Sequence, residues 1–160
     1  MTLNAQGMVQ NVKASLEKYI HDNLVVEEGL NVDFEGTPFE VADAEEWIQE
    51  RILGFVKQDY HRQTSETLHG QTTQVLLSMN VFVDRNASHG RTNRHYEIRD
   101  TIAEYFKVGT VIDLYDFSQD DWSSALQKLF VFEVVTDTPI PNADFHQYTL
   151  TYRVDWLEEW

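Results

Sequence analysis

Residues 72–106 constrain the fold of this chain more than any other stretch, because their apolar positions change from a two-residue to a helical repeat. Alternate positions in the first half are uniformly apolar, namely Val75, Leu77, Met79, Val81 and Val83. Successive side chains of a strand point to opposite faces of its sheet, and here the other face is mixed. The pattern predicts a strand over 72–84 in a sheet that is buried on one side.

A polar loop that contains Gly90 follows this strand, and the pattern then predicts an amphipathic helix over 92–106. Ile98, Ile102 and Phe106 recur at helical spacing and form one apolar stripe. The strand and the helix each carry one apolar surface, and both surfaces are buried if the helix packs back on the sheet. We therefore expect a two-layer arrangement.

The apolar residues over 8–24 fall on one stripe, which predicts another helix. Gly29 is a possible end of this helix. A short strand is predicted over 31–35. Residues 45–56 fit either a helical stripe or a strand face. We favour a strand, because the long strand at 72–84 needs a partner and Gly54 would weaken a helix interior.

Residues 57–70 are polar, and we predict that they form a long hairpin connection. Such a connection exceeds the usual two to about five residues, so we expect it to be functional or mobile.

Three further strands are predicted, over 110–115, 129–137 and 145–156. The second of these is apolar on both faces, so we expect it to lie centrally in the sheet. The fold expected for residues 1–160 is a single α+β domain. It has a mainly antiparallel sheet of about five to six strands, with two helices packed on one face.

The charge balance limits the possible functions, because 27 acidic residues face 12 basic ones and the net charge is −15. Nucleic-acid binders gain affinity by neutralising phosphates with Lys and Arg, so we do not expect such a role. The acidity serves either solubility or a surface that lies near nucleic acid without binding it. No segment approaches the roughly 20 apolar residues of a membrane helix, and no signal-peptide pattern occurs. We expect a soluble protein with no membrane partner.

The candidate chemical groups do not form a recognisable site. The chain has no cysteine, which excludes thiolate chemistry and cysteine metal sites. His61, His69, His89 and His95 lack the spacing of metal ligands, so we interpret them as solvated or capping loop residues. The carboxylates that lie closest together in the sequence are Asp113, Asp116, Asp120 and Asp121. We interpret them as a run of solvated charges. We therefore expect no enzymatic activity, no metal and no cofactor.

Several segments together resemble the tail terminator (head–tail joining) proteins of long-tailed bacteriophages. The resemblance rests on the helix MVQNVKASLEKYI, Trp47 at the start of an early strand, and the long strand that ends in MNVFVD. It continues with the turn NASHG, the helix HYEIRDTIAEYF and the tyrosine-rich last strand YTLTYRVDW. The chain departs from the family in its less compact early region and its long 57–70 segment.

The resemblance implies a structural protein of the virion, assembled in the cytoplasm of the bacterial host. Its family forms a hexameric ring that caps the tail tube, ends tube polymerisation and docks the tail to the head connector. The implied partners are other copies of the chain, the tail tube protein and the head–tail connector protein. DNA would pass through the ring without specific binding, and an acidic lumen would let it slide.

Other functions remain open on the sequence alone. The chain could be another head–tail joining protein or a minor tail protein. From different classes, it could be a small acidic enzyme with an unrecognised site, or an acidic module that regulates a basic partner.

The interface of a ring is expected in the 57–70 segment and at the aromatic C-terminal end. The candidate contact residues are Tyr60, His61, Arg62, Trp122, Trp156 and Trp160. Core burial is an equally good interpretation of Trp156, because it shares the apolar face of the last strand.

Overall fold

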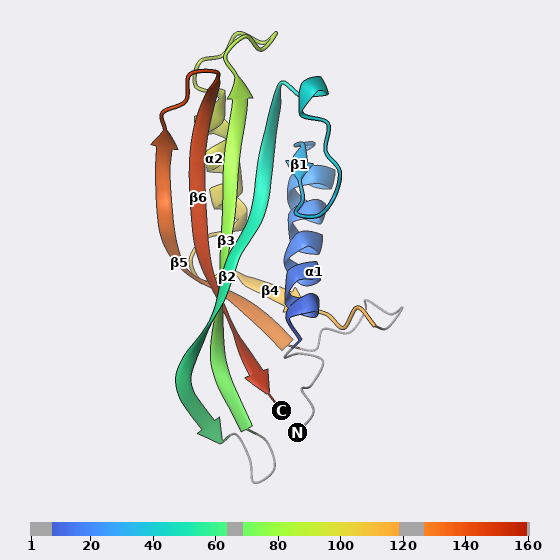
Figure 1. Ribbon diagram of the computed structural model, residues 1–160, viewed down its shortest axis with the longest axis vertical. Coiled ribbons are helices and arrows are strands. Elements are labelled where there is room, and N and C mark those ends of the chain that lie inside the picture. Colours follow the sequence, from blue (N-terminus) through green and yellow to red (C-terminus); the bar gives the residue numbers. More distant parts are fainter. Residues whose placement is uncertain (1–7, 64–68, 119–126, 160) are drawn as a thin grey trace.

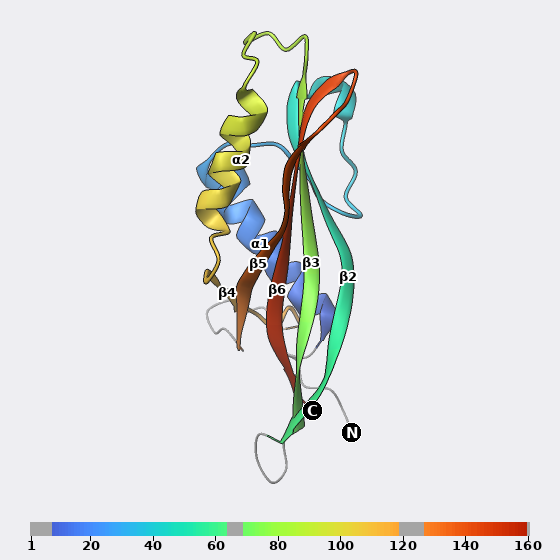
Figure 2. The same cartoon turned by 90° about the vertical axis from the view of Figure 1, so that its left-hand side faces the viewer.

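Six strands form one twisted sheet, and two helices pack against one of its faces (Figures 1 and 2). The computed structural model describes residues 8–63, 69–118 and 127–159. The helices are α1 (Val9–Ile20) and α2 (Arg94–Tyr105). The strands are β1 (Val32–Asp33), β2 (Glu46–Gln63), β3 (His69–Asp84), β4 (Val111–Leu114), β5 (Gln127–Ile140) and β6 (Phe145–Glu159). None of the helices in the described ranges is long and apolar enough to cross a membrane.

The strands lie in the order β1-β2-β3-β6-β5-β4. Every neighbouring pair is antiparallel except β1 and β2, which run parallel over two residues. This arrangement confirms the predicted α+β class with a mainly antiparallel sheet and helices on one face. The strand expected over 31–35 is shorter than predicted. The ambiguous 45–56 segment is strand from Glu46 onward, as favoured, and it pairs with β3.

The helix-facing side of β3 forms the centre of the core. All five of its alternating apolar residues are fully buried, as predicted: Val75, Leu77, Met79, Val81 and Val83. Phe106, at the end of α2, stacks on Tyr152 of β6 with ring centroids 5.2 Å apart. Its ring also contacts the edge of Tyr19 from α1 at 5.4 Å. One aromatic side chain therefore joins both helices to the sheet.

The first helix continues past its predicted end at residue 24, but in a wider form. After Ile20 the chain adopts a π-helical turn over His21–Glu27. Gly29 then takes a positive φ of 69°, which a glycine adopts without strain, and its N–H donates to the carbonyl of Val25. The glycine therefore ends the helix.

Two buried polar side chains connect α1 to the segment after β4. Ser15 Oγ accepts a hydrogen bond from the N–H of Tyr115 at 2.9 Å. Asn11 Oδ1 accepts one from the N–H of Phe117 at 3.1 Å. A buried backbone N–H needs such an acceptor, so these bonds fix where the chain leaves the sheet.

The prediction of a long polar connection over 57–70 is wrong. Strand β2 continues to Gln63 and β3 begins at His69, so much of the segment is paired strand. The two strands extend past the layer of helices as a long hairpin (Figure 1). Ladder hydrogen bonds join backbone groups and do not depend on apolar side chains. A polar sequence can therefore continue a hairpin where no helix covers it.

The prediction that the apolar strand at 129–137 lies centrally is also wrong. It belongs to β5, which is second from the edge, and its neighbour β4 pairs only with the first few residues of β5. Among the described residues, no segment pairs with the outer edge of β5 beyond that point. Four large apolar side chains of β5 are exposed, namely Phe130, Phe132, Val134 and Val135. Apolar composition predicted burial, but each of these side chains is at least 41% exposed.

We expect Phe106→Ala to destabilise the protein by about 3–5 kcal/mol, because it removes a fully buried ring and leaves a cavity between both helices and the sheet. The free energy of unfolding in urea measures the effect. Val108→Ala is the control, since this nearby side chain is exposed and its loss should change stability by less than about 0.5 kcal/mol. Equal effects of the two substitutions would contradict this account of the core.

Candidate functional site

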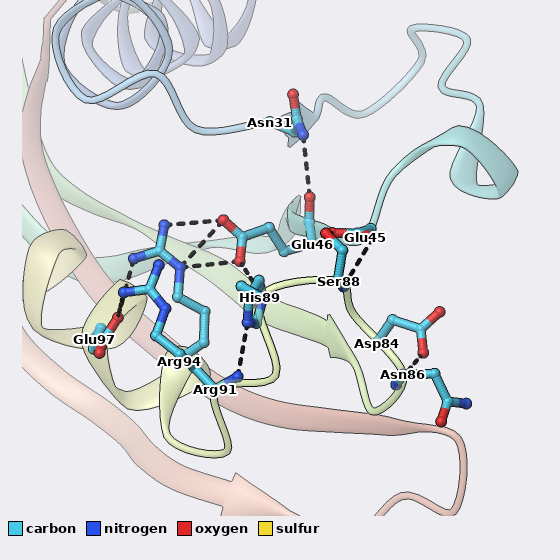
Figure 3. A network of polar contacts seen from close by, with 10 residues as sticks. All are labelled: Asn31, Glu45, Glu46, Asp84, Asn86, Ser88, His89, Arg91, Arg94 and Glu97. Atoms are coloured by element: carbon cyan, nitrogen blue, oxygen red, sulfur yellow. Dashed lines mark hydrogen bonds and ion pairs between the residues drawn. The ribbon is translucent and has the colours of Figure 1, made fainter.

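A network of polar contacts surrounds the turn between β3 and α2 (Figure 3). Glu46, at the start of β2, accepts two hydrogen bonds of 2.9 Å from Nε and Nη2 of Arg94, the first residue of α2. Arg94 also donates to Glu97 at 3.2 Å. These bonds raise the pKa of Arg94, so its charge is permanent. The network ties the first turn of α2 to the start of β2.

The turn itself is held by backbone donors and short side chains. The N–H and the hydroxyl of Ser88 both donate to the carboxylate of Glu45, at 3.0 and 2.9 Å. The N–H of Arg91 donates to Nδ1 of His89 at 3.0 Å. Nε2 of His89 lies 3.6 Å from a carboxylate oxygen of Glu46. His89 thus accepts a backbone hydrogen bond within the turn but does not cap α2, whose N-cap is Asn93, and the turn is held against β2.

His95 does not fit the interpretation of the histidines as solvated or capping residues. It is only 7% exposed, and its ring stacks on His146 of β6 with centroids 4.9 Å apart and planes 13° apart. Burial is the main cause that lowers the pKa of His95, and the neighbouring His146 and Arg85 lower it further. The helix that begins at Arg94 turns His95 toward the sheet, which sequence spacing alone did not reveal.

A buried carboxylate lies under α1, on the helix-facing side of β2. Glu50 is fully buried, and its Oε2 accepts a hydrogen bond of 3.1 Å from the N–H of Glu35. Its Oε1 has no hydrogen-bond partner among the described residues. Burial is the main cause that raises the pKa of Glu50 to about 7. This carboxyl group therefore titrates near neutral pH.

The surroundings of Glu50 are charged as well. Lys13 of α1 forms an ion pair with Glu17, and its Nζ lies 3.5 Å from the carbonyl oxygen of Glu35. The carboxylate of Glu35 accepts a bond of 3.0 Å from the N–H of Ile52. The hydrogen bond from the N–H of Glu35 and the charge of Lys13 lower the pKa of Glu50, whereas the negative charges of Glu17 and Glu35 raise it. A carboxyl group that changes charge in a buried site can move a proton or respond to pH.

Sequence reasoning missed Glu50, although a signal was present. Glu50 lies between Ile48 and Ile52 at two-residue spacing, so on a strand all three share the core face. A single carboxylate in such a row is either buried at a cost in folding free energy or kept for a functional role. The segment was open to a helical interpretation in which Glu50 is a surface residue, and the signal was lost.

The candidate carboxylates and histidines do not converge. Within residues 8–63, 69–118 and 127–159, no three His, Cys, Asp or Glu side chains are placed to hold a metal ion. Asp113 forms an ion pair with Lys128, and Asp116 accepts hydrogen bonds from Ser118. Asp120 and Asp121 lie outside the described residues.

The predicted interface residues are placed only in part. Tyr60, His61 and Arg62 belong to the backbone of β2, but their side chains are outside the described part of the structure. Trp122 and Trp160 are also outside it. Trp156 is buried in the core, where its ring contacts Phe55 edge-on at 5.7 Å. Its burial supports the core interpretation of this residue.

The arrangement defines an α+β protein in which helices cover one face of a long antiparallel sheet. No family model and no curated protein matches the chain. Among solved structures, a similar fold occurs in a protein known only by a sequence identifier, and its name states no function. The likeness has a TM-score of 0.59 at 13% identity, over 96% of this chain and 97% of that one. It shows the fold alone.

We expect Glu50→Gln to remove a pH dependence of stability. The pKa of Glu50 is about 7 in the folded protein and near 4.5 in an unfolded chain, so unfolding between these pH values releases a proton. Stability that depends on Glu50 therefore falls as the pH rises from about 4.5 to 7, by about 3 kcal/mol, and is constant above that range.

The measurement is the free energy of unfolding in urea at pH 4.5 and at pH 8. Between pH 4.5 and pH 8, the free energy of unfolding of the wild type should fall by about 3 kcal/mol more than that of Glu50→Gln. Glu104→Gln is the matched control, because it removes an exposed carboxylate of α2 and should leave the pH profile as in the wild type. If Glu50→Gln showed the same pH dependence of stability as the wild type, Glu50 would not be its cause.

Proposed function

We propose that this chain is a tail terminator protein of a long-tailed bacteriophage. It acts in the virion, at the junction of head and tail, as a ring of identical copies. The ring caps the tail tube, stops tube polymerisation and docks the tail to the head connector. In this role the chain performs no catalysis.

The unit of β3, the NASHG turn and α2 is the observation that supports this proposal most. The family pattern is a long strand that leads through a glycine-containing turn into a helix ending in an aromatic residue. Here Gly90 has a positive φ of 63° in the turn, and Phe106 follows the last residue of α2. The unit lies at the centre of the fold, so the resemblance concerns the core of the protein.

The shape of the sheet is also compatible with a ring subunit. The hairpin of β2 and β3 extends past the helices, so it offers surface away from the core (Figure 1). A subunit that contacts neighbours and two different partners, the tail tube and the connector, needs such surfaces.

The acidic charge fits a protein through which DNA moves. Double-stranded DNA binds proteins mainly through phosphate contacts with Lys and Arg, and a net charge of −15 opposes such contacts. An acidic ring therefore leaves the DNA free to slide. A mainly basic lumen in the assembled ring would contradict this part of the proposal.

We expect the purified protein to assemble into rings. Light scattering coupled to size-exclusion chromatography should give a mass near six times the 18.7 kDa of one chain, and negative-stain images should show a central opening. A strict monomer at every concentration tested would contradict the proposal. Tail tube protein from the same genome provides a functional check, because its polymerisation should stop when the ring is added.

We also expect the protein not to retain DNA. Fluorescence anisotropy of a labelled duplex at about 50 mM salt should show no binding, because the low ionic strength strengthens repulsion between the acidic protein and the phosphates. A basic DNA-binding protein measured on the same duplex provides the positive control. Binding with a Kd of about 10⁻⁶ M or tighter would contradict an inert lumen.

A further inference from the structure

Residues 31–37, which we call the edge segment, run along the outer edge of β2 after the first helix has ended. Their backbone pairing with β2 is short, because β1 contains only Val32 and Asp33, which lie beside Ile48 and Gln49. Past these two residues, hydrogen bonds that involve side chains continue the attachment to β2. The chemistry of a few side chains therefore decides how firmly the edge segment is held.

Two carboxylates hold the edge segment on the helix-facing side of β2. Oε2 of Glu50 accepts a hydrogen bond of 3.1 Å from the N–H of Glu35. In return, Oε2 of Glu35 accepts one of 3.0 Å from the N–H of Ile52. The carboxylates occupy the place that backbone carbonyls have in a strand ladder. We call these two reciprocal bonds the carboxylate clasp.

Arg51 makes a separate attachment on the other face of β2. Its guanidinium donates to a carboxylate oxygen of Asp33 at 2.8 Å and to the carbonyl oxygen of Asp33 at 3.1 Å. Successive strand side chains point to opposite faces, so Arg51 turns away from Glu50. Its charge is committed to Asp33, and the carboxylate clasp has to balance its own charge.

That balance is poor when Glu50 is ionised. The side chain is fully buried, and Oε1 has no hydrogen-bond partner among the described residues. Lys13 of α1 faces this side of β2, but it already forms an ion pair with Glu17. The carboxylate of Glu35 adds a further negative charge, and Met79 lies opposite Glu50 on β3 and offers none. An ionised Glu50 gains free energy if it reaches water, whereas a protonated one loses little by staying buried.

We propose that the carboxylate clasp is a pH-sensitive switch: the edge segment is closed on β2 while Glu50 is protonated, and ionisation of Glu50 releases it. The sheet and both helices keep their fold in the released state. Release uncovers Val32 and Phe34, which pack against the core in the closed state. This device does not depend on the proposed ring, so it can fail without affecting the proposed function.

The direction of the switch follows from the sign of the pKa shift. The pKa of Glu50 is raised to about 7 while it is buried, and it returns toward the ordinary value of 4.5 once water reaches the group. The closed form is therefore favoured at pH 4.5 and below, and it loses stability as the pH rises through 7. Between pH 5 and pH 8 the equilibrium constant for opening should rise on the order of 50-fold.

The test is hydrogen exchange followed by mass spectrometry, expressed as protection factors, which remove the pH dependence of the intrinsic exchange. In the wild type, the protection factor of a peptide that spans the edge segment should fall about 50-fold from pH 5 to pH 8. At pH 8, residues 75–83 of β3 should stay at least about 100-fold better protected. Urea at about 0.5 M should leave exchange of the edge segment unchanged, because a local opening exposes little surface.

Two variants separate Glu50 from other carboxylates. Glu50→Gln keeps the shape of the side chain and cannot ionise, so its edge segment should be equally protected at pH 5 and pH 8. Glu40→Gln is the matched control, because it removes an exposed carboxylate three residues after the edge segment. It should show the same fall in protection as the wild type.

Three results would overturn the inference. The first is a wild-type edge segment whose protection factor is the same at pH 5 and pH 8, a reading that needs no variant. The second is equal protection of the edge segment and of residues 75–83 at pH 8, which would mean that the whole chain unfolds. The third is a folded Glu50→Gln variant that keeps the pH dependence of the wild type.

Discussion

The burial of one face of β3 beneath two helices is the constraint on which the rest of the structure depends. Its five alternating apolar residues are fully buried, and each such side chain contributes about 1.5–3 kcal/mol relative to an exposed one. Strand β3 also pairs along nearly its whole length with β2 on one side and β6 on the other. A slip of one residue would turn the whole apolar row toward solvent, so this face fixes the register of three strands.

The polar groups near the core follow from that packing. The helix α2 can lie on β3 only if the chain reverses in the short turn between them, and Glu45 and Glu46 hold this turn against β2 through Ser88 and Arg94. The same alternation places Glu50 on the core face, where burial raises its pKa to about 7. A buried carboxyl group of this kind is costly, and the N–H of Glu35 compensates it only in part.

The two sides of the sheet differ in how far their apolar side chains are covered. The core is complete around β3 and β6, whereas β5 exposes apolar side chains at an edge that no described segment covers. Open apolar surface on a strongly acidic chain is compatible with the proposed role as a ring subunit.

The sequence by itself determined the class of fold, both helices, the apolar face of β3 and the last three strands. Periodicity reports which face of an element is apolar, and Val75 and Ile102 were correctly assigned to the core for that reason. The sequence did not determine the long β2–β3 hairpin, since backbone pairing leaves no mark on polar residues. It also misplaced β5 and missed Glu50 and the buried ring of His95. Only the tertiary structure decided these features, because what covers a side chain depends on which distant segments pack beside it.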